Sequence, residues 1–89
     1  MDYKEMFNQL YSELSDKALS LNNAYIIKMN NDIHRSLDNL IFENWWGVQL
    51  EDMEYISMIS LNRAERDAAS VVVKVMTDIY DNYSKEDNK

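Results

Sequence analysis

The clearest helical pattern in the chain lies in residues 62–83, which read NRAERDAASVVVKVMTDIYDNY. Apolar side chains recur there at steps of three and four residues, the spacing that gathers them on one face of a helix. They are Ala64, Ala68, Val71, Val72, Val75, Met76, Ile79 and Tyr83. Asn62 and Glu65 have the spacing of a capping box at the start. Residues 71–73 alone favour a strand, but the longer period outweighs them and predicts a helix over residues 63–82.

A second amphipathic pattern covers residues 2–21. Its apolar positions again follow one another at steps of three and four. They are Tyr3, Met6, Phe7, Leu10, Tyr11, Leu14, Ala18 and Leu21. Asp2 and Glu5 have capping-box spacing, although Ser or Thr is preferred at the first position. We therefore expect another long helix over residues 2–21.

The first candidate break follows at Asn22 and Asn23, since Asn tolerates the left-handed conformation that ends helices. Two readings compete beyond it. In one, a single helix continues from residue 2 into the low forties. In the other, residues 24–29 are a short extended piece, and Asn31 or Asp32 caps a second helix that ends near Asn44. We favour two helices with a bend or turn at the two asparagines.

Residues 45–50, Trp-Trp-Gly-Val-Gln-Leu, are expected to interrupt the helices. Gly47 is the sole glycine, and a sole glycine most often serves a backbone turn with positive φ. Glu51 and Asp52 then suit the first turn of a third helix, where negative charge interacts favourably with the helix dipole. One stripe of this helix is expected to consist of Met53, Ile56, Ser57, Ser60 and Leu61.

The chain has 89 residues, no proline, no cysteine and one glycine. Tight turns between strands usually need glycine or proline, so this composition favours helices. We expect one all-α domain over residues 1–89, a compact bundle of three or four helices. The two long helices pack antiparallel and flank a shorter helical segment, and residues 84–89 form a frayed polar tail.

The apolar stripes are wide for a monomer of this size, which predicts a homodimer or a higher homo-oligomer. The residues expected to extend the core across the dimer axis are Tyr3, Phe7, Tyr11, Val72, Val75, Met76 and Ile79.

The net charge of −7 is concentrated in residues 36–62, which we call the acidic window. This window holds no Lys or Arg, whereas the segments on either side of it each carry a net charge of only −1. Its acids are Asp38, Glu43, Glu51, Asp52 and Glu54. It also contains both tryptophans, the only glycine and Tyr55.

The functional interpretation of this window is a protein-binding epitope, with aromatic anchors and carboxylates that steer a basic partner. The candidate residues are Glu43, Trp45, Trp46, Glu51, Asp52, Glu54 and Tyr55. In the alternative, the tryptophans fill an open end of the bundle and the acids only keep that end soluble. Adjacent helix residues point about 100° apart, so we expect one indole to be buried and the other exposed.

The sequence does not predict an enzyme, a cofactor or a metal site. A cysteine nucleophile is absent, and the only histidine, His34, reads as a surface or boundary residue. One glycine cannot build a phosphate-binding loop. Glu51 and Glu54 lie one helical turn apart, as metal-binding pairs do, but further ligands at suitable spacing are missing.

Sixteen acids against nine bases disfavour direct binding to nucleic acid, which relies on neutralising phosphates. No apolar run approaches the roughly 20 residues that cross a membrane, and the first residues do not read as a secretory signal. We expect a cytoplasmic protein of a bacterial cell or of a phage-infected host.

The preferred hypothesis is a non-catalytic inhibitor or regulator that covers a basic, nucleic-acid-binding surface of a larger protein. Phage-type anti-restriction and anti-CRISPR inhibitors are often small and acidic for this reason, an analogy of size and charge alone. Two alternatives stay open. One is a self-assembling structural or adaptor protein. The other is a sequestering protein for a small, nucleotide-like anion, with a pocket built from Tyr11, Tyr25, Lys28 and Arg35.

Overall fold

Four helices make up the part of the chain that the computed structural model describes, residues 2–35 and 42–87. They are α1 (Tyr3–Leu21), α2 (Ala24–Arg35), α3 (Phe42–Ile59) and α4 (Arg63–Asp87), and no strand occurs among these residues. The expected all-α bundle is confirmed. The expectation of one shorter segment between two long helices is wrong, because α3 with 18 residues is nearly as long as α1 with 19.

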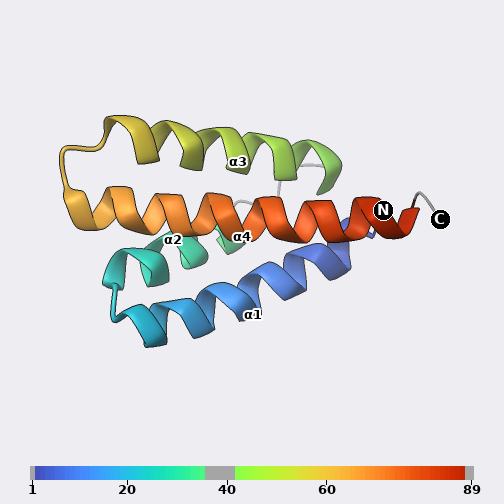
Figure 1. Cartoon of the computed structure of the whole chain (residues 1–89), viewed down its shortest axis with the longest axis horizontal. Helices are drawn as coiled ribbons and strands as arrows, with labels where there is room; N and C mark the ends of the chain where they lie inside the picture. Colours follow the sequence, from blue (N-terminus) through green and yellow to red (C-terminus); the bar gives the residue numbers. More distant parts are fainter. Residues whose placement is uncertain (1, 36–41, 88–89) are drawn as a thin grey trace.

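Helix α4 lies in the middle of the bundle and packs against each of the other three helices (Figure 1). Helices α1 and α3 run in one direction, and α2 and α4 run in the other. The two helices with the clearest sequence patterns, α1 and α4, therefore lie antiparallel, as expected. The α1–α2 turn and the α3–α4 turn lie at the same end of the molecule, which we call the turn end.

Both expected N-caps are present. The backbone N–H of Glu5 donates to Asp2 Oδ1 over 3.0 Å, and that of Glu65 donates to Asn62 Oδ1 over 3.3 Å. Each bond satisfies one of the amides that the first turn of a helix leaves without a partner. The starts of α1 and α4 are thus encoded by residues next to them in the sequence.

The break at the two asparagines is also confirmed. Asn22 ends α1 in the left-handed conformation, with φ 49° and ψ 45°. Asn23 then starts α2, since its side-chain Oδ1 accepts a hydrogen bond from the Tyr25 backbone N–H over 2.9 Å. Helix α2 begins at Ala24, so residues 24–29 are helical and Asn31 and Asp32 lie inside the helix instead of capping it. The extended piece and the single helix running into the low forties are therefore both wrong.

The expected interruption at residues 45–50 is wrong. Helix α3 runs without a break through Gly47, which has no positive φ, and Asn44 lies in α3 instead of ending the second helix. The physical reason is burial on one side of α3. Its buried residues, Trp45, Trp46, Gln49 and Met53, keep helical spacing across the glycine. Burial of these side chains stabilises the helix by more than the cost of glycine inside it, which is about 1 kcal/mol relative to Ala.

Helix α4 extends beyond its expected end. It continues through Asp87, so residues 84–87 are not a frayed tail, and residues 88–89 lie outside the described part of the chain. Tyr83 contributes to this extension, because it packs against the core and its hydroxyl donates to Gln9 Oε1 of α1 over 3.2 Å. A contact with a distant helix therefore supports the last turns.

The hydrophobic core draws on all four helices and contains most of the side chains assigned above to a dimer interface. Phe7, Val72, Val75, Met76 and Ile79 are buried within the single chain. Tyr3 is half-buried, and Tyr11 is 43% exposed. The expectation that these residues extend the core across a dimer axis is therefore wrong for the five buried ones, because they pack in the core that the four helices of one chain form. Oligomerisation itself stays a prediction.

Trp45 and Trp46 are both buried, at 0% and 2% exposure, so the expectation of one exposed indole is wrong. Adjacent residues can both be buried because α3 contacts two helices, α4 and α1. The Trp45 ring packs edge-on against Phe7 of α1, and its centroid lies 6.0 Å from that of Trp46. Exposed His34 also stacks on Phe7, with ring centroids 5.4 Å apart, which places this histidine at the surface as expected.

Candidate functional site

Helix α3 divides the acidic window into a buried side and an exposed side. The exposed residues of α3 from Val48 onward cover about 160° of the helix surface at about 100° per residue, from Glu54 round to Asp52 at the edge near Trp45. We call them the outer face of α3: Val48, Glu51, Asp52, Glu54, Tyr55, Met58 and Ile59. This face joins three carboxylates to four apolar or aromatic side chains, and α3 contains no Lys or Arg.

Four of the seven predicted site residues come together on this face. They are Glu51, Asp52, Glu54 and Tyr55. Trp45 and Trp46 lie on the opposite side of the helix, inside the core, where they cannot contact a partner without opening the bundle. The side chain of Glu43 lies outside the described part of the chain.

Sequence reasoning missed the apolar part of this surface. Tyr55 is 62% exposed, Met58 79% and Ile59 52%, and Leu61 in the following turn is 102% exposed. We call these four residues the apolar ridge. Leu61 was assigned to a stripe with buried Met53, and that assignment is wrong because the residue lies in the turn beyond α3. Tyr55 and Met58 follow Glu51 by four and seven residues, so a helix that begins at Glu51 already places all three on one side, and the signal was present in the sequence.

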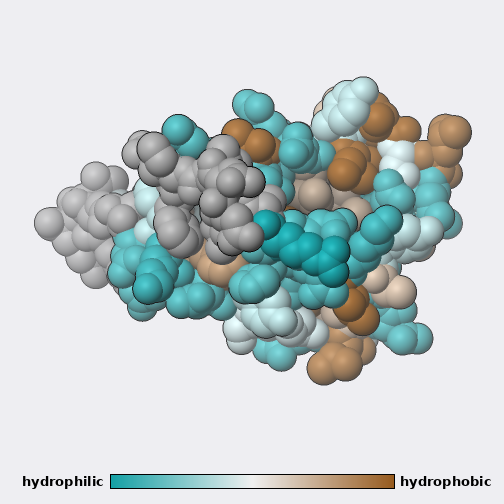
Figure 2. Space-filling model, turned by 180° about the vertical axis from the view of Figure 1, so that it is seen from behind, coloured by the Kyte–Doolittle hydropathy of each residue, from teal (hydrophilic) through white to brown (hydrophobic). Residues whose placement is uncertain are grey.

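Hydrophobic side chains gather at the turn end of the molecule, the right-hand end of Figure 2. Two hydrogen bonds between the turns hold this end in place. Asn62 Nδ2 donates to the Tyr25 hydroxyl over 2.7 Å, and Asn23 Nδ2 donates to the Ala64 carbonyl over 3.0 Å. Leu61 therefore projects from a turn that is tied to the neighbouring helix pair.

Gly47 lies on the exposed side of α3, next to the outer face. A Cβ atom added there meets nothing within 4 Å, and its φ is not positive. A glycine inside a helix costs about 1 kcal/mol relative to Ala, because the unfolded chain loses more freedom on folding. No contact in the described part of the chain requires this residue to be glycine.

The residues expected to form an anion pocket are not brought together. Tyr25 and Lys28 line a hollow of about 110 Å³, which also contains the carboxylates of Asp32 and Glu65. Tyr11 lines a different cavity, between α1 and α2. The prediction of one pocket composed of Tyr11, Tyr25, Lys28 and Arg35 is therefore wrong, because the two tyrosines line separate hollows.

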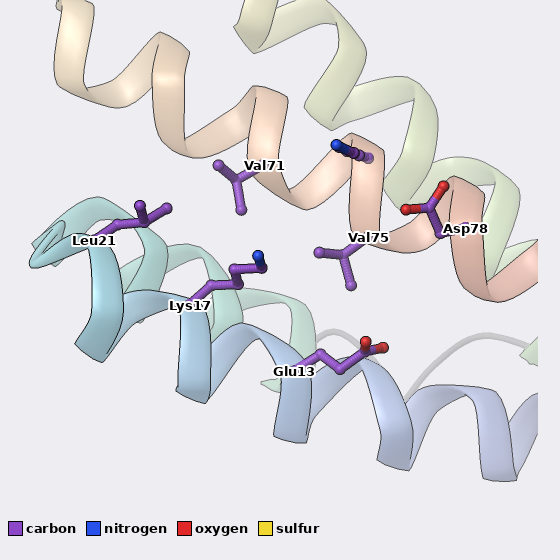
Figure 3. Close-up of a pocket in the computed structure, with 7 residues that line it drawn as sticks. Glu13, Lys17, Leu21, Val71, Val75 and Asp78 are labelled. Carbon is purple, nitrogen blue, oxygen red and sulfur yellow. The ribbon is translucent and has the colours of Figure 1, made fainter.

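A larger groove of about 400 Å³ lies between α1 and α4, and sequence reasoning did not identify it. Figure 3 shows Lys17 reaching from α1 toward Val71 and Val75 of α4, with the carboxylates of Glu13 and Asp78 further along. Leu21 and Lys74 complete the lining. Two cations and two anions leave the groove without a net charge. It therefore lacks the electrostatic selectivity that a site for a small anion requires.

The described residues, 2–35 and 42–87, show neither a metal site nor a membrane-spanning helix. These residues contain no group of three or more His, Cys, Asp or Glu side chains placed to hold a metal ion. None of their helices is both long enough and apolar enough to cross a membrane.

Comparisons of the chain with protein-family models, with curated proteins and with solved structures found no match.

Proposed function

We propose that this chain is a non-catalytic protein-binding module that covers a basic surface of a larger protein with the outer face of α3. One observation carries the proposal. Glu51, Asp52 and Glu54 are all exposed, as is Tyr55, on one helix that has no Lys or Arg, and Glu51 lies one turn before Tyr55. In this reading the buried tryptophans hold α3 to the bundle, and the carboxylates and Tyr55 meet the partner.

The charge of this face favours association with a cationic surface. Carboxylates that are not neutralised locally raise the rate at which oppositely charged proteins meet, and they disfavour partners of like charge. Tyr55 adds a large, amphipathic contact of the kind that often contributes most to binding. A surface that normally holds nucleic-acid phosphates has the complementary charge, so inhibition of a nucleic-acid-processing enzyme follows as the proposed activity.

Affinity capture from bacterial lysate tests the proposal, with washes at low and then high salt and identification of bound proteins by mass spectrometry. The outer-face variant is E51K/D52K/E54K. A matched control makes the same charge change at exposed acids elsewhere: D16K/D67K/D81K. We expect the wild type and the control to retain a DNA- or RNA-processing enzyme that elutes with salt, and the outer-face variant to lose it.

Circular dichroism of all three proteins must show the same helicity, so that a loss of binding reports on the surface. Equal capture by the wild type and the outer-face variant contradicts the proposal. Loss of capture by the control as well shows that overall net charge, and not the α3 face, determines binding.

A self-assembling structural or adaptor protein is the second candidate, because the apolar ridge exposes large side chains to solvent. It predicts that mass in solution rises with concentration and that the charge reversals leave this rise unchanged. The charge of the chain opposes it, since two copies joined through this face bring Glu51, Asp52 and Glu54 of each copy close together.

A further inference from the structure

The apolar ridge and Gly47 lie at opposite ends of the acidic part of α3. Val48, next to Gly47, lies on the same exposed side as Tyr55 and Ile59. Residues 48 and 59 are separated by roughly 16 Å along the helix axis at 1.5 Å per residue, which is about three helical turns. The exposed side of α3 is thus long enough to accept another helix along its length.

The composition of this side defines the chemistry of its occupant. Apolar side chains at helical spacing form the ridge into which the side chains of a second helix pack. The carboxylates of Glu51, Asp52 and Glu54 flank those apolar positions and require cationic groups opposite them. A second copy of this chain brings three further acids to the same place, and a nucleic acid brings phosphates, so both have the wrong charge.

Gly47 supplies an independent observation. It weakens α3, and no contact in the described part of the chain needs it. A residue without a side chain on an exposed helix face allows the backbone of another molecule to come close. The apolar ridge lies on the same side of the helix, so both features point to one binding partner.

We propose that the occupant of this surface is an amphipathic, Lys- or Arg-rich helix of the partner protein. It lies along α3, its backbone comes closest at Gly47, and its apolar side packs on Tyr55, Met58 and Leu61. Its basic residues meet the carboxylates of the outer face. This inference rests on the proposed function and adds the structure of the segment that is recognised.

A defined peptide tests the inference with the full chain. The probe is a fluorescent helix of about 18 residues, or five turns, with Leu at positions i, i+3, i+4 and i+7 and Lys elsewhere. A scrambled peptide of identical composition lacks the apolar face. Fluorescence anisotropy gives the dissociation constants. We expect the amphipathic peptide to bind at least about tenfold more tightly than the scrambled one, because only it can pack on the ridge.

Three variants locate the binding surface. The ridge variant M58S/I59S/L61S is expected to weaken binding of the amphipathic peptide by about tenfold or more, since these side chains carry the apolar contact. The matched control removes exposed apolar side chains from α1 and α2: L19S/L21S/I27S. It is expected to bind as the wild type does. G47A is expected to raise the thermal midpoint and yet weaken binding, an effect that a purely intramolecular glycine does not produce.

The outcomes separate this inference from the proposed function. Equal binding of the two peptides, or no binding of either, overturns the amphipathic-helix inference, and so does a ridge variant that binds like its control. If E51K/D52K/E54K weakens the binding of both peptides equally, the result supports the acidic binding surface of the proposed function but not an amphipathic helix as its occupant. If the charge reversals have no effect on binding, both proposals fail. Concentration-dependent dimerisation that M58S/I59S/L61S abolishes identifies a second copy as the occupant and overturns the inference.

Discussion

Trp45 of α3 and Phe7 of α1 pack edge to face, with ring centroids 5.1 Å apart and ring planes at 79°. This is a favoured geometry for aromatic pairs, because the positive edge of one ring meets the negative face of the other. The contact holds the inner side of α3 against a helix that lies far away in the sequence. The outer face of α3 is consequently turned toward solvent.

Replacing Trp45 by Ala is therefore expected to destabilise the whole bundle. The loss of a fully buried indole and the cavity left behind cost about 3–5 kcal/mol, to be measured by urea unfolding. The control is Tyr55→Ala on the outer face, with an expected change within roughly 0.5 kcal/mol. Similar losses at the two positions contradict the assignment of inner and outer sides. An unfolded Trp45→Ala variant beside a stable Tyr55→Ala variant supports it.

Gly47→Ala is expected to stabilise the protein. The added methyl group meets nothing within 4 Å, and the backbone has no positive φ, so the change restores helix propensity without strain. The gain is about 1 kcal/mol, which corresponds to roughly 4–8 °C in Tm for a domain of this size. Thermal unfolding followed by circular dichroism measures it. A decrease in Tm is the result that a turn at this residue predicts.

Asn62 is expected to contribute to stability through two separate contacts. Asn62→Ala removes both the cap of α4 and the hydrogen bond to the Tyr25 hydroxyl, at a cost of about 1–3 kcal/mol. Tyr25→Phe removes only the second contact. The double variant is expected to lose less than the sum of the single losses, since both single changes break the same bond. Strictly additive losses in urea unfolding show that this bond contributes nothing.

Salt is expected to distinguish the two parts of the partner-binding surface. Raising the ionic strength screens the charge of the carboxylates, so that it acts over a Debye length of only about 3 Å at 1 M. Association with a cationic partner becomes slower as a result. The ridge variant M58S/I59S/L61S is expected to speed dissociation while leaving the salt dependence of association unchanged. Surface plasmon resonance with the amphipathic peptide measures both rates. A wild-type association rate that does not respond to salt contradicts electrostatic steering by Glu51, Asp52 and Glu54.

Helices α1 and α4 and the break at Asn22 follow from short-range information. A cap such as Asn62 bonds to an amide three residues away, and a periodic stripe such as that of α4 needs no knowledge of the remaining chain. The position of the carboxylates on the surface was predictable for a similar reason, since unpaired charges are costly to bury.

The course of α3 and the side that it exposes depend on distant residues. Gly47 destabilises the helix by about 1 kcal/mol relative to Ala, and burial of two indoles against α1 and α4 stabilises it by more than that. Met58 and Ile59 have the hydrophobicity of core residues, yet they are exposed, because Met53 and the tryptophans occupy the side of α3 that meets the bundle. A local pattern specifies which residues share a helix face. The packing of helices that are remote in the sequence determines which face is covered, because burial requires a partner surface.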